Sequence, residues 1–227
     1  MLREVLDLSK RTFIEYHNRE PDYGALFRLI FRFIAAKLHA DRQYPGNDWN
    51  SPEPQTVIRA VDEFYFQNTE AEPILTDERV QRAAWRHIQS AFHLQNLSVE
   101  ALAFIYENTL VEPETRRRYG THATPPYIAE YAVRHLPFEN LPPEERRVFE
   151  PFAGHAPFLI AALGRLRNLL PANTDAKQRH EYFVRMLSGM EIDSFAREIA
   201  RYSLILADYP NPDGWRLSGG NITPVSG

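Results

Sequence analysis

The chain has 227 residues, 44% of them hydrophobic and 12% aromatic, which is enough to bury a sizeable core in one large domain or two small ones. Its formal net charge of -4 gives no overall attraction to nucleic acid, and the absence of cysteine excludes disulfides, thiolate catalysis and cysteine-ligated metal sites. We expect a cytoplasmic protein without a membrane partner, since the N-terminus lacks a secretory signal pattern and no apolar segment is long enough to span a bilayer.

The first part of the chain predicts a bundle of helices. Apolar residues recur at helical spacing between residues 26 and 38, with Arg32 away from the apolar stripe and Asp22 as the N-cap. Further helices are expected over residues 54–67, 77–93 and 98–109, the last two with Thr76 and Ser98 as N-caps. We therefore predict a helical domain over residues 1–110.

The second part, residues 111–227, predicts strands that alternate with helices. Its first helix is expected to begin at Thr124, which would cap the free amides, and Pro125, which loses no hydrogen bond at the first helical position. Strands are expected over residues 147–150, about 184–191 and near 215–217, with helices over 157–169 and 194–207 between them. This order predicts an α/β fold, the first part of a Rossmann-like domain with an incomplete parallel sheet.

The end of the first predicted strand carries the most informative motif. Residues 149–159 lead from a strand through Glu150 and a turn of small residues into a helix. In an open α/β sheet, ligands lie beyond the carboxyl ends of the strands, where small residues let the backbone approach the ligand and helix amides face the same cleft. A single glycine, Gly154, also suits an ordinary strand-to-helix turn, so this motif alone leaves both interpretations open.

A second acidic residue, Glu191, ends the next predicted strand about forty residues later. A carboxylate in that place can accept hydrogen bonds from both hydroxyls of a ribose. The alternative is a solvated charge at a strand end. For Asp193 we prefer a structural role, as the N-cap of the following helix. Two acidic strand ends at this spacing favour a nucleoside site more than either does alone.

Residues 116–129, 150–159 and 189–193 together resemble three successive motifs of the gamma-type N6-adenine DNA methyltransferases, in the order and spacing of that family. Residues 26–32 resemble the helical region that precedes the methylase core in large restriction-modification and related phage-defence enzymes. The resemblance implies an S-adenosylmethionine-binding domain from a parent enzyme that methylates adenine N6 in double-stranded DNA.

The resemblance also implies which residues hold the cofactor. The positions concerned are Gly120, Thr121, His122, Thr124, Pro125, Glu150, Phe152, Ala153, Gly154, Glu191, Ile192 and Asn221. Those before residue 126 would lie near the methionine end, and those from 150 to 154 would form the loop around the cofactor. Glu191 would bind the ribose and Ile192 would pack on the adenine. Asn221 stands where the family has an aspartate that accepts from the adenine amino group.

Two departures from the family pattern matter. Ala156 occupies a loop position where glycine is common, so its methyl group is expected to crowd the cofactor. The tetrapeptide Asn/Asp-Pro-Pro-Tyr/Phe, which aims the flipped adenine at the methyl donor, does not occur in the sequence. Its nearest counterpart, residues 211–214, has the composition of a turn. We therefore assign no catalytic residue and expect an N-terminal fragment that is inactive alone.

Two other functions stay open at this point. The chain could serve as a helical scaffold or interaction module whose degenerate cofactor fold binds nothing. A different nucleotide-dependent enzyme of doubly wound fold is the third hypothesis, and the helix start at Thr124, placed before the first strand, argues against it. The eight histidines show no metal-binding spacing, so no metal site is assigned.

Overall fold

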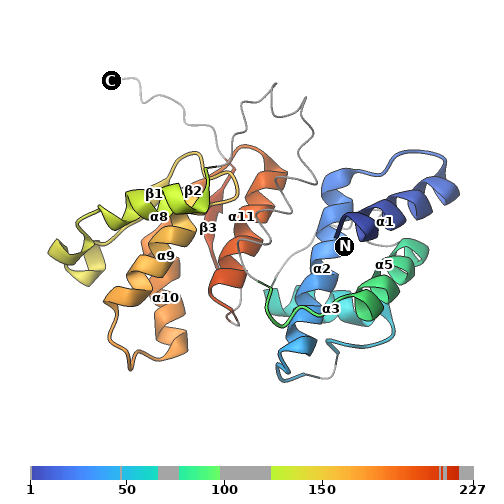
Figure 1. Ribbon diagram of the computed structural model, residues 1–227, viewed down its shortest axis with the longest axis horizontal. Helices are drawn as coiled ribbons and strands as arrows, with labels where there is room; N and C mark the ends of the chain where they lie inside the picture. Colours follow the sequence, from blue (N-terminus) through green and yellow to red (C-terminus); the bar gives the residue numbers. More distant parts are fainter. Residues whose placement is uncertain are drawn as a thin grey trace. The chain divides into compact units, whose positions relative to one another are not determined.

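The computed structural model describes residues 2–46, 48–65, 77–97, 124–209, 211 and 214–219. The chain divides into two compact units, Met1–Leu97 and Ser98–Gly227, and each has buried hydrophobic residues of its own (Figure 1). The predicted domain boundary at residues 110 and 111 and the predicted helix over 98–109, with its cap Ser98, lie outside the described residues. Among the described residues, no helix combines the length and the apolar character needed to cross a membrane.

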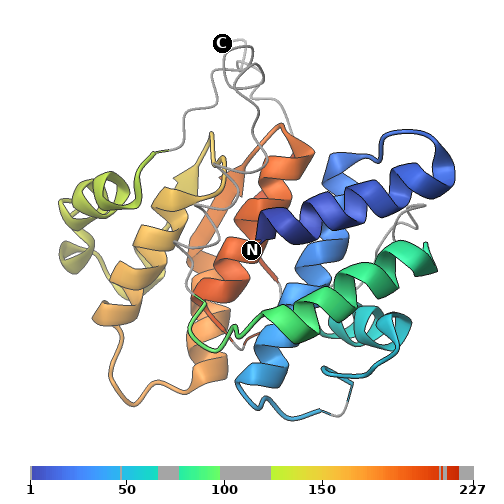
Figure 2. The same cartoon turned by 45° about the vertical axis from the view of Figure 1, so that its right-hand side comes forward.

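The first unit is helical, as predicted. Its elements are α1 (Leu2–His17), α2 (Tyr23–Asp41), α3 (Pro54–Tyr65) and α5 (Glu78–Ala91). Helices α1 and α5 run side by side, which Figure 1 and Figure 2 both show. The predicted cap of α2 is confirmed, since the Asp22 carboxylate accepts from Ala25 N over 2.7 Å. The predicted cap of α5 at Thr76 is wrong, because the Asp77 carboxylate accepts from the amides of Arg79 and Val80.

Helix α2 is buried over most of its circumference and forms the centre of this unit. Its buried apolar residues include Leu26, Phe27, Leu29, Ile30, Phe33 and Ile34. The ring of Phe33 stacks on that of Trp85 from α5, with centroids 5.2 Å apart. Arg32, which was predicted to lie away from the core, is only 2% exposed and pairs with Asp62 of α3 over 2.8 Å. The neighbouring helices therefore cover more of the α2 surface than the apolar stripe in the sequence predicted.

The second unit contains a parallel sheet of three short strands. Its elements in chain order are α8 (Pro126–Arg134), the 3-10 helices η2 (Phe138–Asn140) and η3 (Pro143–Glu145), β1 (Val148–Glu150), α9 (Pro157–Leu169), α10 (Ala176–Met186), β2 (Leu187–Met190), α11 (Ser194–Ala207) and β3 (Arg216–Ser218). The strand order is β1-β2-β3, and both pairings are parallel. The predicted α/β class and incomplete parallel sheet are therefore confirmed.

Helix α8 begins one residue later than predicted. Pro125 is its N-cap with ψ near 139°, no side chain caps the helix, and Pro126 is the first helical residue. A residue that precedes proline is pushed out of the helical region, so Pro125 cannot itself be helical. Thr124 consequently lies outside the helix and does not cap it.

The second strand is shorter than predicted because a helix precedes it directly. Asp175 caps α10 by accepting from Lys177 N (2.9 Å) and Gln178 N (3.3 Å), and the helix continues to Met186. Residues 184–186, predicted as strand, are therefore helical.

The connecting helices lie on one face of the sheet. The strands follow one another across the sheet in sequence order, so right-handed crossovers place α9, α10 and α11 on the same side. In agreement, a Cβ built on Gly189 of β2 would lie 3.0 Å from the side chain of Leu159 in α9. Phe149 faces the other side of the sheet and is 56% exposed.

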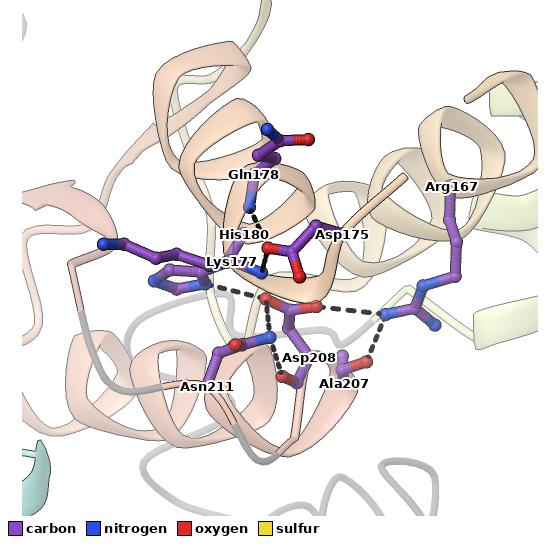
Figure 3. Close-up of polar contacts among 8 residues, drawn as sticks. All are labelled: Arg167, Asp175, Lys177, Gln178, His180, Ala207, Asp208 and Asn211. Carbon is purple, nitrogen blue, oxygen red and sulfur yellow. Dashed lines mark hydrogen bonds and ion pairs between the residues drawn. The ribbon is translucent and has the colours of Figure 1, made fainter. Parts of the chain in front are cut away.

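A buried carboxylate ties these helices together (Figure 3). Asp208, directly after α11, is 2% exposed, and its carboxylate contacts His180 Nδ1 (2.7 Å), Arg167 Nη2 (3.4 Å) and Asn211 Nδ2 (3.1 Å). Asn211 also donates to the Asp208 carbonyl over 3.0 Å. Asn211 therefore stabilises a turn, in line with the interpretation of residues 211–214 as a turn, of which Pro212 and Asp213 lie outside the described residues.

Candidate functional site

Glu150 ends β1 with its carboxylate against the N-terminus of α9. It is 8% exposed, and its Oε2 accepts from Leu159 N over 3.2 Å, with the Phe158 amide as a further donor. The pKa of Glu150 is raised to about 8, mainly by burial and to a smaller extent by the nearby charge of Glu191, and the two amides oppose that rise. The N-cap residue of α9, Ala156, has no side-chain acceptor. The Glu150 carboxyl group therefore accepts from the free amides at the start of α9, as the side chain of an N-cap residue would.

The loop between β1 and α9 crosses the end of β2. Ala153 N donates to Met190 O over 2.9 Å, and the side chain of Ala153 is buried. Gly154 has φ +51°, a left-handed conformation that favours glycine, and within the part of the chain that the structure describes no atom lies within 4 Å of a Cβ built there. The loop thus presents backbone to open space at Gly154.

Ala156 adopts φ 67° and ψ 41°, also in the left-handed region, and is fully buried. The cost of alanine at this position is therefore in the backbone conformation, about 1–2 kcal/mol for an L-residue with a side chain. Its methyl group is buried in the protein, and the expectation that it crowds a bound cofactor stays a prediction.

Glu191 joins the loop after β2 to the loop after β1. Its Oε2 accepts from Gly154 N and its Oε1 from Asp193 N, both over 2.8 Å. Its own N–H donates to Ser218 O of β3 over 2.9 Å. These bonds argue against the interpretation of Glu191 as a solvated charge at a strand end. The expectation that the two acidic residues leave neighbouring parallel strands is met, since Glu150 of β1 is in register with Gly189 of β2.

Asp193 has the structural role predicted for it. Its Oδ1 accepts from Ala196 N over 3.0 Å, and its carbonyl accepts from Arg197 N, so it caps the N-terminus of α11. Beside it, Ile192 is 67% exposed, and Phe152 in the neighbouring loop is 79% exposed. Two apolar side chains therefore stand in solvent on the same edge of the sheet as the two carboxylates.

The other predicted site residues lie before α8 or after β3 in the sequence. Thr124 and Pro125 are partly buried at the start of α8, which packs on α9. Gly120, Thr121, His122 and Asn221 lie outside the described residues, so their assignment to the site stays a prediction.

Sequence reasoning missed two residues of this region. His155 in the β1 loop is 3% exposed, and burial lowers its pKa to about 4, so it is neutral at physiological pH. Arg197 donates from Nη1 to the Glu191 carbonyl over 2.9 Å. A signal for Arg197 existed in the sequence, because a cation in the first turn of a helix opposes the helix dipole and calls for a specific partner.

Comparison with known proteins gives a family match for part of the second unit. Residues 142–218 match the family model of the MmeI DNA-methyltransferase domain. A solved structure similar to the chain is that of the ATP-dependent Type ISP restriction-modification enzyme LlaBIII bound to DNA, with a TM-score of 0.41 and 13% identity over 91% of this chain. The chain spans 16% of the length of that enzyme. No curated protein matches the chain.

The matched segment begins before β1 and ends with β3, so it contains Glu150, Gly154 and Glu191. The family match therefore supports, for residues 142–218, the resemblance to a DNA methyltransferase.

Proposed function

We propose that the chain is the S-adenosylmethionine-binding portion of a site-specific DNA adenine-N6 methyltransferase from a restriction-modification or related defence system. The observation that carries the proposal is the hydrogen bond between Gly154 and Glu191, which joins the loops that follow the neighbouring strands β1 and β2 at the carboxyl edge of the sheet. The family match over residues 142–218 supports the reaction class. Double-stranded DNA would be the partner of the parent protein, and a cytoplasmic location follows from such a role.

The carboxylate of Glu191 suits the vicinal hydroxyls of a ribose. Each of its oxygens accepts one backbone N–H over 2.8 Å. A carboxylate oxygen has two lone-pair directions, so each retains the capacity to accept one hydroxyl. The two hydrogen bonds already made fix the carboxylate in place before a ligand arrives, which reduces the entropic cost of binding.

The surroundings of Glu191 suit the other parts of the same cofactor. A Cβ built on Gly154 would meet no atom of the described residues within 4 Å, so the loop leaves room for a ligand there. The exposed side chain of Ile192 offers an apolar surface for a purine ring. The carboxylate of Glu191 favours a cationic ligand over a neutral one. When bound, S-adenosylmethionine supplies a methyl group activated by its positive sulfur.

Titration calorimetry of the full chain with S-adenosylmethionine tests this proposal. We expect saturable binding that is lost in Glu191→Ala. Glu181→Ala is the matched control, because Glu181 is an exposed glutamate on α10, away from the strand ends, and its removal should leave binding unchanged. A folded wild-type chain that binds no cofactor would favour the alternative function, a helical scaffold with a degenerate cofactor fold.

We further propose that these 227 residues alone do not methylate DNA, since they contain no Asn/Asp-Pro-Pro-Tyr/Phe tetrapeptide to hold the target adenine. Incubation of the chain with radiolabelled cofactor and adenine-containing duplexes should leave the DNA unlabelled. Label in N6-methyladenine would contradict this assignment without contradicting cofactor binding.

A further inference from the structure

The side chain of Arg197 bridges the carboxyl ends of β2 and β3. It leaves the first turn of α11 and donates from Nη1 to the Glu191 carbonyl over 2.9 Å. The same guanidinium lies against Gly219, the residue that follows β3. The bridge therefore includes the backbone of the very residue whose carboxylate faces the loop after β1.

Gly219 is what allows the guanidinium to lie there. A Cβ built on Gly219 would overlap Nη1 and would lie 2.8 Å from Cζ, closer than real Cβ atoms approach. The backbone of Gly219 is not in the left-handed region, unlike that of Gly154 and Gly214. A side chain at position 219 would consequently displace the guanidinium, which is the far end of a flexible side chain.

Arg197 completes the fixation of Glu191. The Glu191 N–H donates to Ser218 O, its carboxylate accepts from Gly154 N and Asp193 N, and its carbonyl accepts from Arg197. Without the guanidinium, the carbonyl loses this donor, and the peptide between Glu191 and Ile192 can rotate. A rotation there moves the carboxylate and the apolar side chain together.

We propose that Arg197 is a positioning residue for Glu191, that Gly219 makes room for it, and that the pair sets the preference of the site for a nucleoside with both ribose hydroxyls. This inference rests on the proposed function. A carboxylate whose position is fixed to within a fraction of an ångström can hydrogen-bond both hydroxyls at once, whereas a mobile carboxylate cannot. The effect is thus on discrimination between ligands, more than on overall affinity.

The test compares binding of S-adenosylmethionine and its 2′-deoxyribose analogue to the full chain by calorimetry. The wild-type chain should prefer the ribose form by about 10- to 100-fold, the range expected for a hydrogen bond to a charged group. Arg197→Met keeps the length of the side chain and removes the guanidinium, and it should reduce that preference to about threefold or less. Arg197→Lys should restore part of the preference.

Gly219→Ala provides an independent way to displace the guanidinium. It should reduce the preference as Arg197→Met does, and the double variant should be no worse than Arg197→Met alone, since the two changes remove the same contact. Arg134→Met, at an exposed arginine at the end of α8, is the matched control and should keep the wild-type preference. Circular dichroism of every variant verifies that it is folded.

The possible failures are distinguishable. Wild-type discrimination retained in Arg197→Met or Gly219→Ala would overturn the role of Arg197 and leave the proposed function standing. Equal loss of affinity for both ligands would also overturn it, because a purely structural residue would have that effect. A folded wild-type chain that binds neither ligand would overturn the proposed function and this inference with it.

Discussion

The backbone N–H of Gly154 donates to Oε2 of Glu191 over 2.8 Å, although the two residues are 37 positions apart in the sequence. The bond joins the loop after β1 to the loop after β2 at the carboxyl edge of the sheet. Because Oε1 of the same carboxylate accepts from Asp193 N, one side chain satisfies two backbone donors in different loops. The candidate site is therefore held by the same contacts that hold the fold.

Removal of the Glu191 carboxylate should destabilise the second unit. Glu191→Ala leaves the amides of Gly154 and Asp193 without their acceptor, at a cost of about 1–3 kcal/mol in the free energy of unfolding. Urea denaturation followed by circular dichroism measures the loss. Glu191→Gln retains one acceptor oxygen and should lose less. If Glu191→Ala proved as stable as the wild type, the carboxylate could not hold the two loops together in solution.

Ala156→Gly should cost far less stability than an ordinary buried alanine-to-glycine change. An alanine is strained in the left-handed conformation of residue 156, which glycine adopts freely. Ala162 in α9 is the matched control, since it is equally buried but lies inside a helix, where glycine costs about 1 kcal/mol. We expect Ala156→Gly to be more stable than Ala162→Gly by about 2 kcal/mol. Equal midpoints of thermal denaturation would contradict the strain at Ala156.

Because of Glu150, the second unit is expected to lose stability as the pH rises. Burial, with the charge of Glu191 as a smaller cause, raises the pKa of Glu150 in the folded chain to about 8 from an ordinary 4.5. The folded chain thus binds a proton more tightly than the unfolded chain does, so this stabilisation is complete below pH 4.5 and is lost as the pH rises through 8. The change is on the order of a few kcal/mol.

Thermal denaturation between pH 5 and 9 measures this effect, and Glu150→Gln should flatten the curve. Glutamine keeps an acceptor for the α9 amides while it removes the titration. A Glu150→Gln variant whose pH dependence equals that of the wild type would show that another group titrates in this range.

Because of His39, the first unit is expected to lose stability as the pH falls. It is fully buried and stacks on Trp49 with centroids 4.3 Å apart. Burial, and to a smaller extent the charge of Arg42, lowers the pKa of His39 to about 4 from 6.5. The corresponding stability is present above pH 6.5 and is lost as the pH falls through 4.

Tryptophan fluorescence measures the stability of this unit when Trp215, the tryptophan of the other unit, is replaced by phenylalanine. In that background His39→Phe should reduce the loss of stability between pH 6.5 and 4. A loss as steep as before would assign the acid sensitivity to other groups.

The elements that could be predicted from the sequence are those whose signals are local. Asp22 and Asp193 cap the helices that follow them, and α9 occupies the predicted residues, because each depends on side chains within one helical turn. The acidic strand ends were also identifiable, since a parallel sheet brings successive carboxyl ends to one edge.

The predictions that failed depended on neighbours in sequence or in space. Pro126 excludes Pro125 from the helix, which displaced the cap expected at Thr124. Residues 184–186 were predicted as strand, yet the helix capped by Asp175 continues through them to Met186. The contact of Arg197 with Glu191 and Gly219 joins three separate elements, and no periodicity in the sequence reports it.

Substitution of Asp208 should strongly destabilise the second unit (Figure 3). Its buried carboxylate accepts from Asn211 and Arg167 and contacts His180 Nδ1, so it links the turn after α11 to α9 and α10. Asp208→Ala leaves these polar groups without their shared partner, and we expect a loss of about 3–5 kcal/mol in the free energy of unfolding.

Arg167→Ala is the matched control, because the Arg167 side chain is 40% exposed and water can replace its contact with Asp208. That variant should lose about 1 kcal/mol or less. Urea denaturation of the two variants and of Asp208→Asn, which keeps the shape without the charge, separates shape from charge. If Asp208→Ala lost no more stability than Arg167→Ala, the carboxylate would be a solvated acceptor, and the packing of α9, α10 and α11 would rest on their apolar faces alone.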